Sequence, residues 1–209
     1  MTFFEFVKES QLNADIILNA DFFSYGAMWG GIISIIIYLL SARIFKIKME
    51  HIFPMKIPAL KHWMIWAGIM ILFGLAGAFV NANTDLLKTD FMEKFAATMT
   101  NQTTALLGIG IFAPIAEELL FRGILYKGLK DALNGVAAVW IISVIFAGIH
   151  VPQYLNSDVN LANVGAMSML LLSLSLILGF ARHYSKSILI PIVLHILNNS
   201  LTVFFGSGA

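Results

Sequence analysis

The chain has 209 residues, of which 59% are hydrophobic and only 12% are charged, and its formal net charge is +1. The apolar fraction is well above that of an ordinary soluble domain and indicates a membrane protein, while so small a net charge gives no electrostatic reason to expect nucleic acid as a partner. Cysteine is absent, which excludes disulfides, thiolate metal sites and a cysteine nucleophile.

The first 21 residues interleave phenylalanines with charged side chains, and Glu5, Lys8, Glu9 and Asp15 interrupt the apolar stretch. This mixture predicts an amphipathic segment that lies at the membrane interface. We expect no signal peptide here, because the stretch has neither a basic start nor a small-residue cleavage site. Targeting is therefore expected to depend on the internal spans.

An uncharged run over residues 22–42 is the first predicted span, because about 20 apolar residues suffice to cross the ~30 Å hydrocarbon layer. Residues 43–62 carry five Lys and Arg against one acidic residue, which places them in the cytoplasm by the positive-inside rule. Further apolar runs follow at about 63–80, 103–127, 135–152, 162–181 and 188–205. Of the 13 Lys and Arg residues, all except Lys8, Lys88 and Lys94 then fall on the cytoplasmic side.

The pattern predicts an all-α fold, a polytopic transmembrane helix bundle of about six spans plus interfacial helices, with both chain ends outside. A polar stretch at 81–101 predicts a surface helix on the outer side, and the pattern leaves open whether residues 1–21 or 85–100 insert in the bilayer. No internal repeat or linker divides the chain. Residues 1–209 are therefore predicted to form a single membrane-embedded domain.

Two carboxylates and a guanidinium stand together in the apolar run Ala116-Glu-Glu-Leu-Leu-Phe-Arg-Gly123. An ionisable group at bilayer depth costs several kcal/mol unless it is paired or hydrated, so this stretch is a candidate functional site. Successive helical side chains turn by about 100°, so Glu117 and Glu118 point to different places. Glu118 and Arg122 are i, i+4 neighbours and form the natural ion pair, which leaves Glu117 available. Pro114 is expected to kink the helix and open a wet notch beside the carboxylates.

Two of the five histidines, His150 and His195, lie within or at the ends of long apolar runs. His195 and Asn199 share one helix face, and their N–H groups suit a developing oxyanion. Phe146, one turn before His150, either packs beneath the imidazole or faces lipid. The alternative for the whole set is structural: a Glu–Arg pair that joins two helices, and histidines bonded to backbone carbonyls.

These residues closely resemble the CAAX protease and bacteriocin-processing (CPBP, Abi) family of intramembrane proteases. The family pattern is Glu-Glu-x-x-x-Arg, then Phe-x-x-x-His, then His-x-x-x-Asn, on successive core helices. Here the motifs read Glu117-Glu118-Leu-Leu-Phe-Arg122, Phe146-Ala-Gly-Ile-His150 and His195-Ile-Leu-Asn-Asn199. The resemblance covers roughly residues 103–205, which would be the motif-bearing catalytic core.

The resemblance implies an intramembrane endopeptidase that hydrolyses membrane-associated peptides or protein tails. Glu117 would be the general base on water, His150 would help to hold that water, and Glu118 with Arg122 would support the site. His195 and Asn199 would stabilise the oxyanion. The compact form suggests a multi-pass protein of a bacterial plasma membrane, engaged in processing of, or immunity against, bacteriocin-like or pheromone peptides.

Three alternatives remain open at this stage. Glu117, His150 and His195 are the residue types of a zinc hydrolase, so a metal-dependent enzyme is possible. The metal-free glutamate mechanism is favoured, because the chain has no His-Glu-x-x-His helix and a metal would occupy the best base. The other two are a non-catalytic immunity or scaffold protein against bacteriocin-like peptides, and a small proton-coupled transporter, for which no inverted repeat is visible.

Overall fold

The structure is a computed structural model that describes residues 20–206 except 47, 88–94, 96 and 156–159. All regular secondary structure in these residues is helical. Six helices are separate: α2 (Ala20–Ile44), α3 (Met49–Ile52), α4 (Leu60–Asn83), α9 (Gly135–Leu155), α10 (Leu161–Ser185) and α11 (Leu189–Gly206). Between α4 and α9 runs one continuous helix of five parts: α6 (Gln102–Ala105), η1 (Leu106–Phe112), α7 (Ala113–Glu118), η2 (Leu119–Leu125) and α8 (Tyr126–Ala132).

Five of the described helices are long and apolar enough to cross a membrane, and α11 is a shorter apolar helix. The predicted all-α, polytopic bundle is therefore confirmed. Most helices extend a few residues beyond the predicted runs, and α9 continues through Pro152. The predicted interfacial segment 1–21 lies outside the described residues apart from Ala20 and Asp21, which begin α2. The predicted surface helix at 81–101 lies partly outside them.

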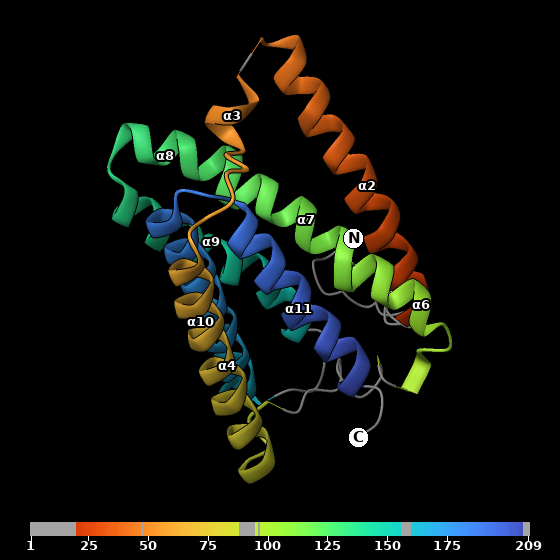
Figure 1. The fold of residues 1–209 in the computed structure, drawn as a ribbon. Coiled ribbons are helices and arrows are strands. Elements are labelled where there is room, and N and C mark those ends of the chain that lie inside the picture. Colours follow the sequence, from red (N-terminus) through yellow and green to blue (C-terminus); the bar gives the residue numbers. More distant parts are fainter. Residues whose placement is uncertain (1–19, 47, 88–94, 96, 156–159, 207–209) are drawn as a thin grey trace, which may run out of the picture.

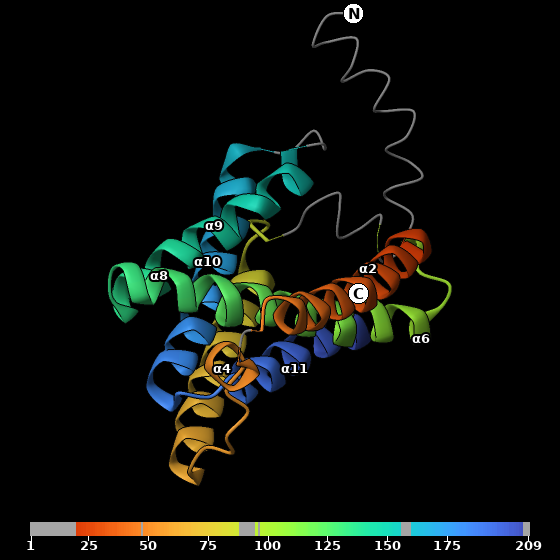
Figure 2. The same ribbon diagram turned by 90° about the horizontal axis from the view of Figure 1, so that it is seen from above.

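The continuous helix 102–132 runs obliquely across the bundle (Figures 1 and 2). As a regular α-helix at roughly 1.5 Å per residue, its 31 residues would span about 46 Å, so it is long enough to cross the ~30 Å hydrocarbon layer even when tilted. α11 lies between this helix on one side and α4 with α10 on the other, and α9 packs against α10. α2 packs on η1 and α7 and diverges from the helix toward α8.

The helices differ in where their large apolar side chains lie. α9, α10 and the 102–132 helix bury an apolar core around Phe121, Val139 and Phe146, and Trp66 of α4 packs with Leu178 of α10. α2 and α4 keep large apolar side chains on the outside, such as Trp29 and Phe79. An outer surface of this kind suits lipid contact.

The helix that carries the paired glutamates departs from α geometry twice. η1 and η2 are π-helical and flank the six-residue segment α7. Pro114 lies in the first turn of α7 and is fully buried. A π turn lies directly before the proline at which a kink was predicted, and such turns are frequent at functional sites.

Candidate active site

The Glu118–Arg122 ion pair predicted from the i, i+4 spacing is present and completely buried. Arg122 Nη1 donates to Glu118 Oε1 over 2.9 Å, and the side chains are 1% and 0% exposed. On the other side of the guanidinium, Nη2 donates to Ser175 Oγ (2.8 Å) and Ser175 O (3.0 Å). The guanidinium carbon also lies 5.0 Å from the centre of the Phe146 ring. The pair thus joins the 102–132 helix to α9 and α10.

His195 of α11 is held by the same carboxylate. Its Nδ1 lies 2.9 Å from Glu118 Oε1, in a side chain that is only 3% exposed. Because an ionised carboxylate only accepts, Nδ1 carries a proton and Nε2 points elsewhere. Nε2 lies 3.8 Å from Glu117 Oε2, which is ion-pair distance but too long for a direct hydrogen bond.

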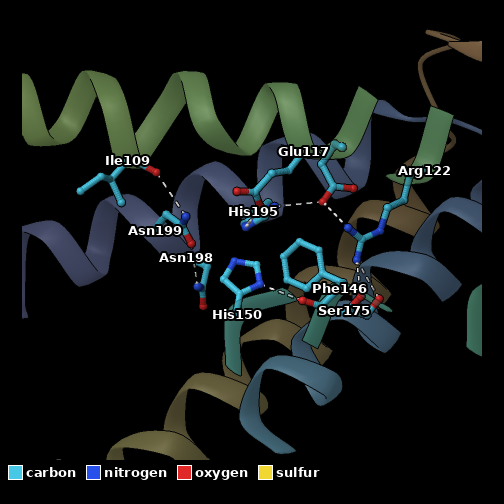
Figure 3. A network of polar contacts seen from close by, with 10 residues as sticks. Ile109, Glu117, Arg122, Phe146, His150, Ser175, His195, Asn198 and Asn199 are labelled. Carbon is cyan, nitrogen blue, oxygen red and sulfur yellow. Dashed lines mark hydrogen bonds and ion pairs between the residues drawn. The ribbon is translucent and has the colours of Figure 1, made fainter. Parts of the chain in front are cut away.

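Glu117 has the opposite environment to its neighbour. Its side chain is 29% exposed, and its carboxylate has no hydrogen bond to the described part of the chain. The predicted division of the two glutamates is therefore seen: Glu118 lies in a buried network with Arg122, and Glu117 lies outside that ion pair and is partly exposed. Figure 3 shows Glu117 above His195 and His150.

His150 is placed by the backbone and by an aromatic ring. Its Nδ1 bonds to Phe146 O at 2.7 Å, one turn earlier on α9, so Nδ1 is the donor and Nε2 keeps a lone pair. The Phe146 ring packs against the imidazole at a centroid distance of 4.7 Å and also lies 6.0 Å from the His195 ring. Phe146 thus packs under His150, one of its two predicted positions, and the two histidines flank a single ring.

Asn199 lies one turn after His195 on α11. Its Nδ2 donates to the carbonyl of Ile109 in η1 over 3.2 Å, and its Oδ1 accepts from Asn198 Nδ2 over 3.2 Å. The carboxamide is therefore oriented, and one of its two N–H groups remains available. All four predicted catalytic residues come from α7, α9 and α11 and gather in one region (Figure 3).

Two residues of this network were not predicted from the sequence. Ser175 is completely buried and holds Arg122, and Arg182 donates from Nε to Arg122 O over 3.1 Å. Both lie on α10, more than 50 residues away along the chain. α10 contains several serines with no distinguishing local pattern, so only the folded arrangement singles out Ser175.

The zinc alternative was tested on the same geometry. Within the described residues, no three His, Asp or Glu side chains lie close enough together to hold a metal ion. Both imidazoles do present Nε2 with Nδ1 engaged, as metal-ligating histidines often do. Glu117 does not complete a three-ligand set with them, so these residues do not fit a zinc centre.

The motifs and their geometry agree with comparison to known proteins. The model of one protein family, described as type II CAAX prenyl endopeptidase Rce1-like, matches residues 99–201, which include all three motifs. Searches of curated proteins and of solved structures found no match. The chain therefore contains a domain of the Rce1-like type II CAAX prenyl endopeptidase family (CPBP, Abi), which spans residues 99–201.

Proposed function

We propose that this protein is an intramembrane endopeptidase that hydrolyses membrane-associated peptides or protein tails, with Glu117 as general base. Membership of its family implies protease activity in the membrane. The observation that carries the residue assignment is the contrast between two adjacent carboxylates. Glu118 is buried and its Oε1 lies within hydrogen-bond distance of both Arg122 and His195, whereas Glu117 is partly exposed and free of hydrogen bonds to the described chain.

The attacking water is proposed to lie between Glu117 and His150. Glu117 accepts a proton from it, and the Nε2 lone pair of His150 accepts its second hydrogen bond. The bond from His150 Nδ1 to Phe146 O supports this role, because it fixes the tautomer that leaves Nε2 as an acceptor. Two acceptors around one water orient its oxygen lone pair toward the scissile carbonyl.

His195 and Asn199 are proposed to bind the oxyanion. Asn199 offers its second amide N–H, and His195 offers Nε2–H when both of its ring nitrogens are protonated. Glu118 Oε1 and Glu117 Oε2 lie 2.9 Å and 3.8 Å from the Nδ1 and Nε2 atoms of His195. Donors placed at a developing oxyanion typically contribute about 10²–10³ in rate each.

The proton taken by Glu117 is then delivered to the leaving nitrogen. The water oxygen forms a bond to the carbonyl carbon, the C–N bond breaks, and Glu117 returns to its ionised form as the amine departs. The base therefore acts as the acid of the second step, and no other proton donor is required.

The position of the site and the family support this substrate class. Glu117 is the midpoint of the helix 102–132, and this position favours a substrate that reaches it inside the bilayer. The family description names a CAAX prenyl endopeptidase. The sequence motifs lead us to expect a bacteriocin or pheromone peptide as the substrate in a bacterial plasma membrane. The bacterial membrane stays a prediction.

The experiment compares peptide termini in membranes that hold the wild type, Glu117→Gln or Glu50→Gln at equal abundance. Glu50 is an exposed glutamate of α3, so its substitution controls for loss of a carboxylate. Cleavage is also measured on an internally quenched peptide with a farnesylated CAAX end and on its unprenylated counterpart, with and without 1,10-phenanthroline.

We expect termini that are present with the wild type and Glu50→Gln and absent with Glu117→Gln, and no effect of the chelator. Cleavage that persists in Glu117→Gln would remove the general-base assignment. Inhibition by the chelator would favour the metal-dependent alternative. Identical termini in all three membranes, with both peptides intact, would favour the non-catalytic immunity or scaffold protein.

A further inference from the structure

Two side chains of α11 are bonded to main-chain carbonyls inside another helix. Asn199 Nδ2 donates to Ile109 O over 3.2 Å, and Ser200 Oγ lies 3.5 Å from Gly110 O. A carbonyl within a helix normally accepts from an N–H group of its own helix. Some feature of the 102–132 helix must therefore leave these carbonyls available to donors from α11.

For Ile109 O, that feature is Pro114. The N–H of Ala113 donates to Gly108 O, five residues earlier, as the π turn requires. In the same pattern the N–H of residue 114 would donate to Ile109 O, but proline has no N–H. An unpaired carbonyl at membrane depth is unfavourable, so a donor from outside the helix is strongly favoured. Asn199 is that donor.

The glycine next to Ile109 lets α11 come close enough. A Cβ added at Gly110 would lie 3.0 Å from Ser200 Oγ, tighter than most contacts in proteins. The bare backbone at Gly110 therefore allows the α11 side chains to lie within hydrogen-bond reach of η1. Pro114 and Gly110 are four residues apart, and both affect the contact between η1 and α11.

We propose that Pro114 is a positioning residue for Asn199, because it leaves Ile109 O without a helical donor and so holds the Asn199 carboxamide in place. With one N–H on Ile109 O and Oδ1 on Asn198, the carboxamide keeps one orientation and its second N–H stays available for the substrate oxygen. The role at the oxyanion rests on the proposed function. The hydrogen bond from Asn199 to Ile109 O does not depend on the proposed function.

The test restores the backbone N–H group that is missing at position 114. Pro114→Ala introduces an N–H that competes with Asn199 for Ile109 O. The matched control is Pro191→Ala, because Pro191 is also fully buried but is the third residue of α11, where an N–H has no helical acceptor. On the quenched peptide that the wild type cleaves, we expect kcat to fall about tenfold in Pro114→Ala at nearly constant KM, and to change little in Pro191→Ala.

Thermal stability in detergent separates positioning from a general packing defect. We expect the midpoint of Pro114→Ala to equal or exceed that of the wild type, because an interior helix gains a good helix former and a hydrogen bond. Lower activity with undiminished stability is the signature of the proposed role. Unchanged kcat, or a parallel loss of stability and activity, would overturn it.

A readout that needs no cleavage keeps the inference testable if the wild type turns over neither peptide. With ¹⁵N-asparagine labelling and assignment by Asn199→Asp, the exchange rate of the Asn199 carboxamide protons is compared in the two variants. Exchange several-fold faster in Pro114→Ala and unchanged in Pro191→Ala would support the hold by Ile109 O even if the protease assignment failed. Equal exchange in wild type and Pro114→Ala would contradict it.

Discussion

At the scale of single residues, Glu117 and Glu118 are neighbours whose substitutions should separate chemistry from stability. Glu118→Gln removes one charge of a buried pair and leaves Arg122 uncompensated, which should lower the free energy of unfolding by about 3 kcal/mol. Glu117→Gln changes a partly exposed carboxylate without hydrogen bonds in the described chain, so stability should change by less than about 1 kcal/mol. Unfolding in detergent measures both, and equal losses would contradict the division of roles.

Ser175 should influence activity through Arg122 although it lies on another helix. Ser175→Ala removes one of the two Ser175 acceptors of Nη2, and hydrogen bonds to charged groups contribute about 1.5–3 kcal/mol. We expect activity to fall about tenfold, with recovery in Ser175→Thr, which keeps the hydroxyl. Ser143→Ala is the control, because Ser143 is equally buried and its hydroxyl has no partner in the described residues. An equal effect of both alanine variants would show that only packing matters.

At the scale of elements, the contact of α2 with η1 depends on bare backbone. A Cβ added at Gly108 would lie 2.2 Å from the carbonyl oxygen of Ser24, and backbone cannot rotate away as a side chain can. Gly108→Ala should therefore force the helices apart and destabilise the protein by about 1–3 kcal/mol. Gly30→Ala, on an open face of α2, should leave stability unchanged or slightly higher. Thermal unfolding in detergent compares the two, and equal midpoints would argue against a close crossing.

At the scale of the whole molecule, the predicted orientation places the end of α4 outside and α8 inside. The absence of cysteine allows single-cysteine labelling without further changes. Ala82→Cys lies in an exposed last turn of α4, and Gly128→Cys has open space around its new side chain. A membrane-impermeant maleimide should label Ala82→Cys in intact cells and Gly128→Cys only after lysis. The reverse pattern would invert the topology.

Local rules predicted much of this molecule. The apolar runs located the helices to within a few residues, and the spacing of Glu118 and Arg122 predicted their ion pair. Two features were not predicted because they depend on tertiary structure. One is the pair of hydrogen bonds from Arg122 to Ser175. The other is the two π turns, which leave hydrophobic periodicity almost unchanged. Straight, parallel helices would also have left His150 deeper than Glu117. Helix 102–132 instead runs obliquely across the bundle (Figure 1), and Glu117 and His150 lie in one region (Figure 3). The catalytic roles stay predictions until substitutions test them.

The π turns also affect how the 102–132 helix tolerates changes in its length. Each π turn holds a residue more than an α turn, so a one-residue deletion within Leu106–Phe112 would let that segment return to α geometry without breaking the helix. The parts of the helix before and after the deletion would then keep their rotation against each other, and the contact with α2 and the carboxylates would still face their partners. A one-residue deletion in the α-helical segment Ala113–Glu118 has no extra residue to remove and would rotate the two parts by about 100° against each other.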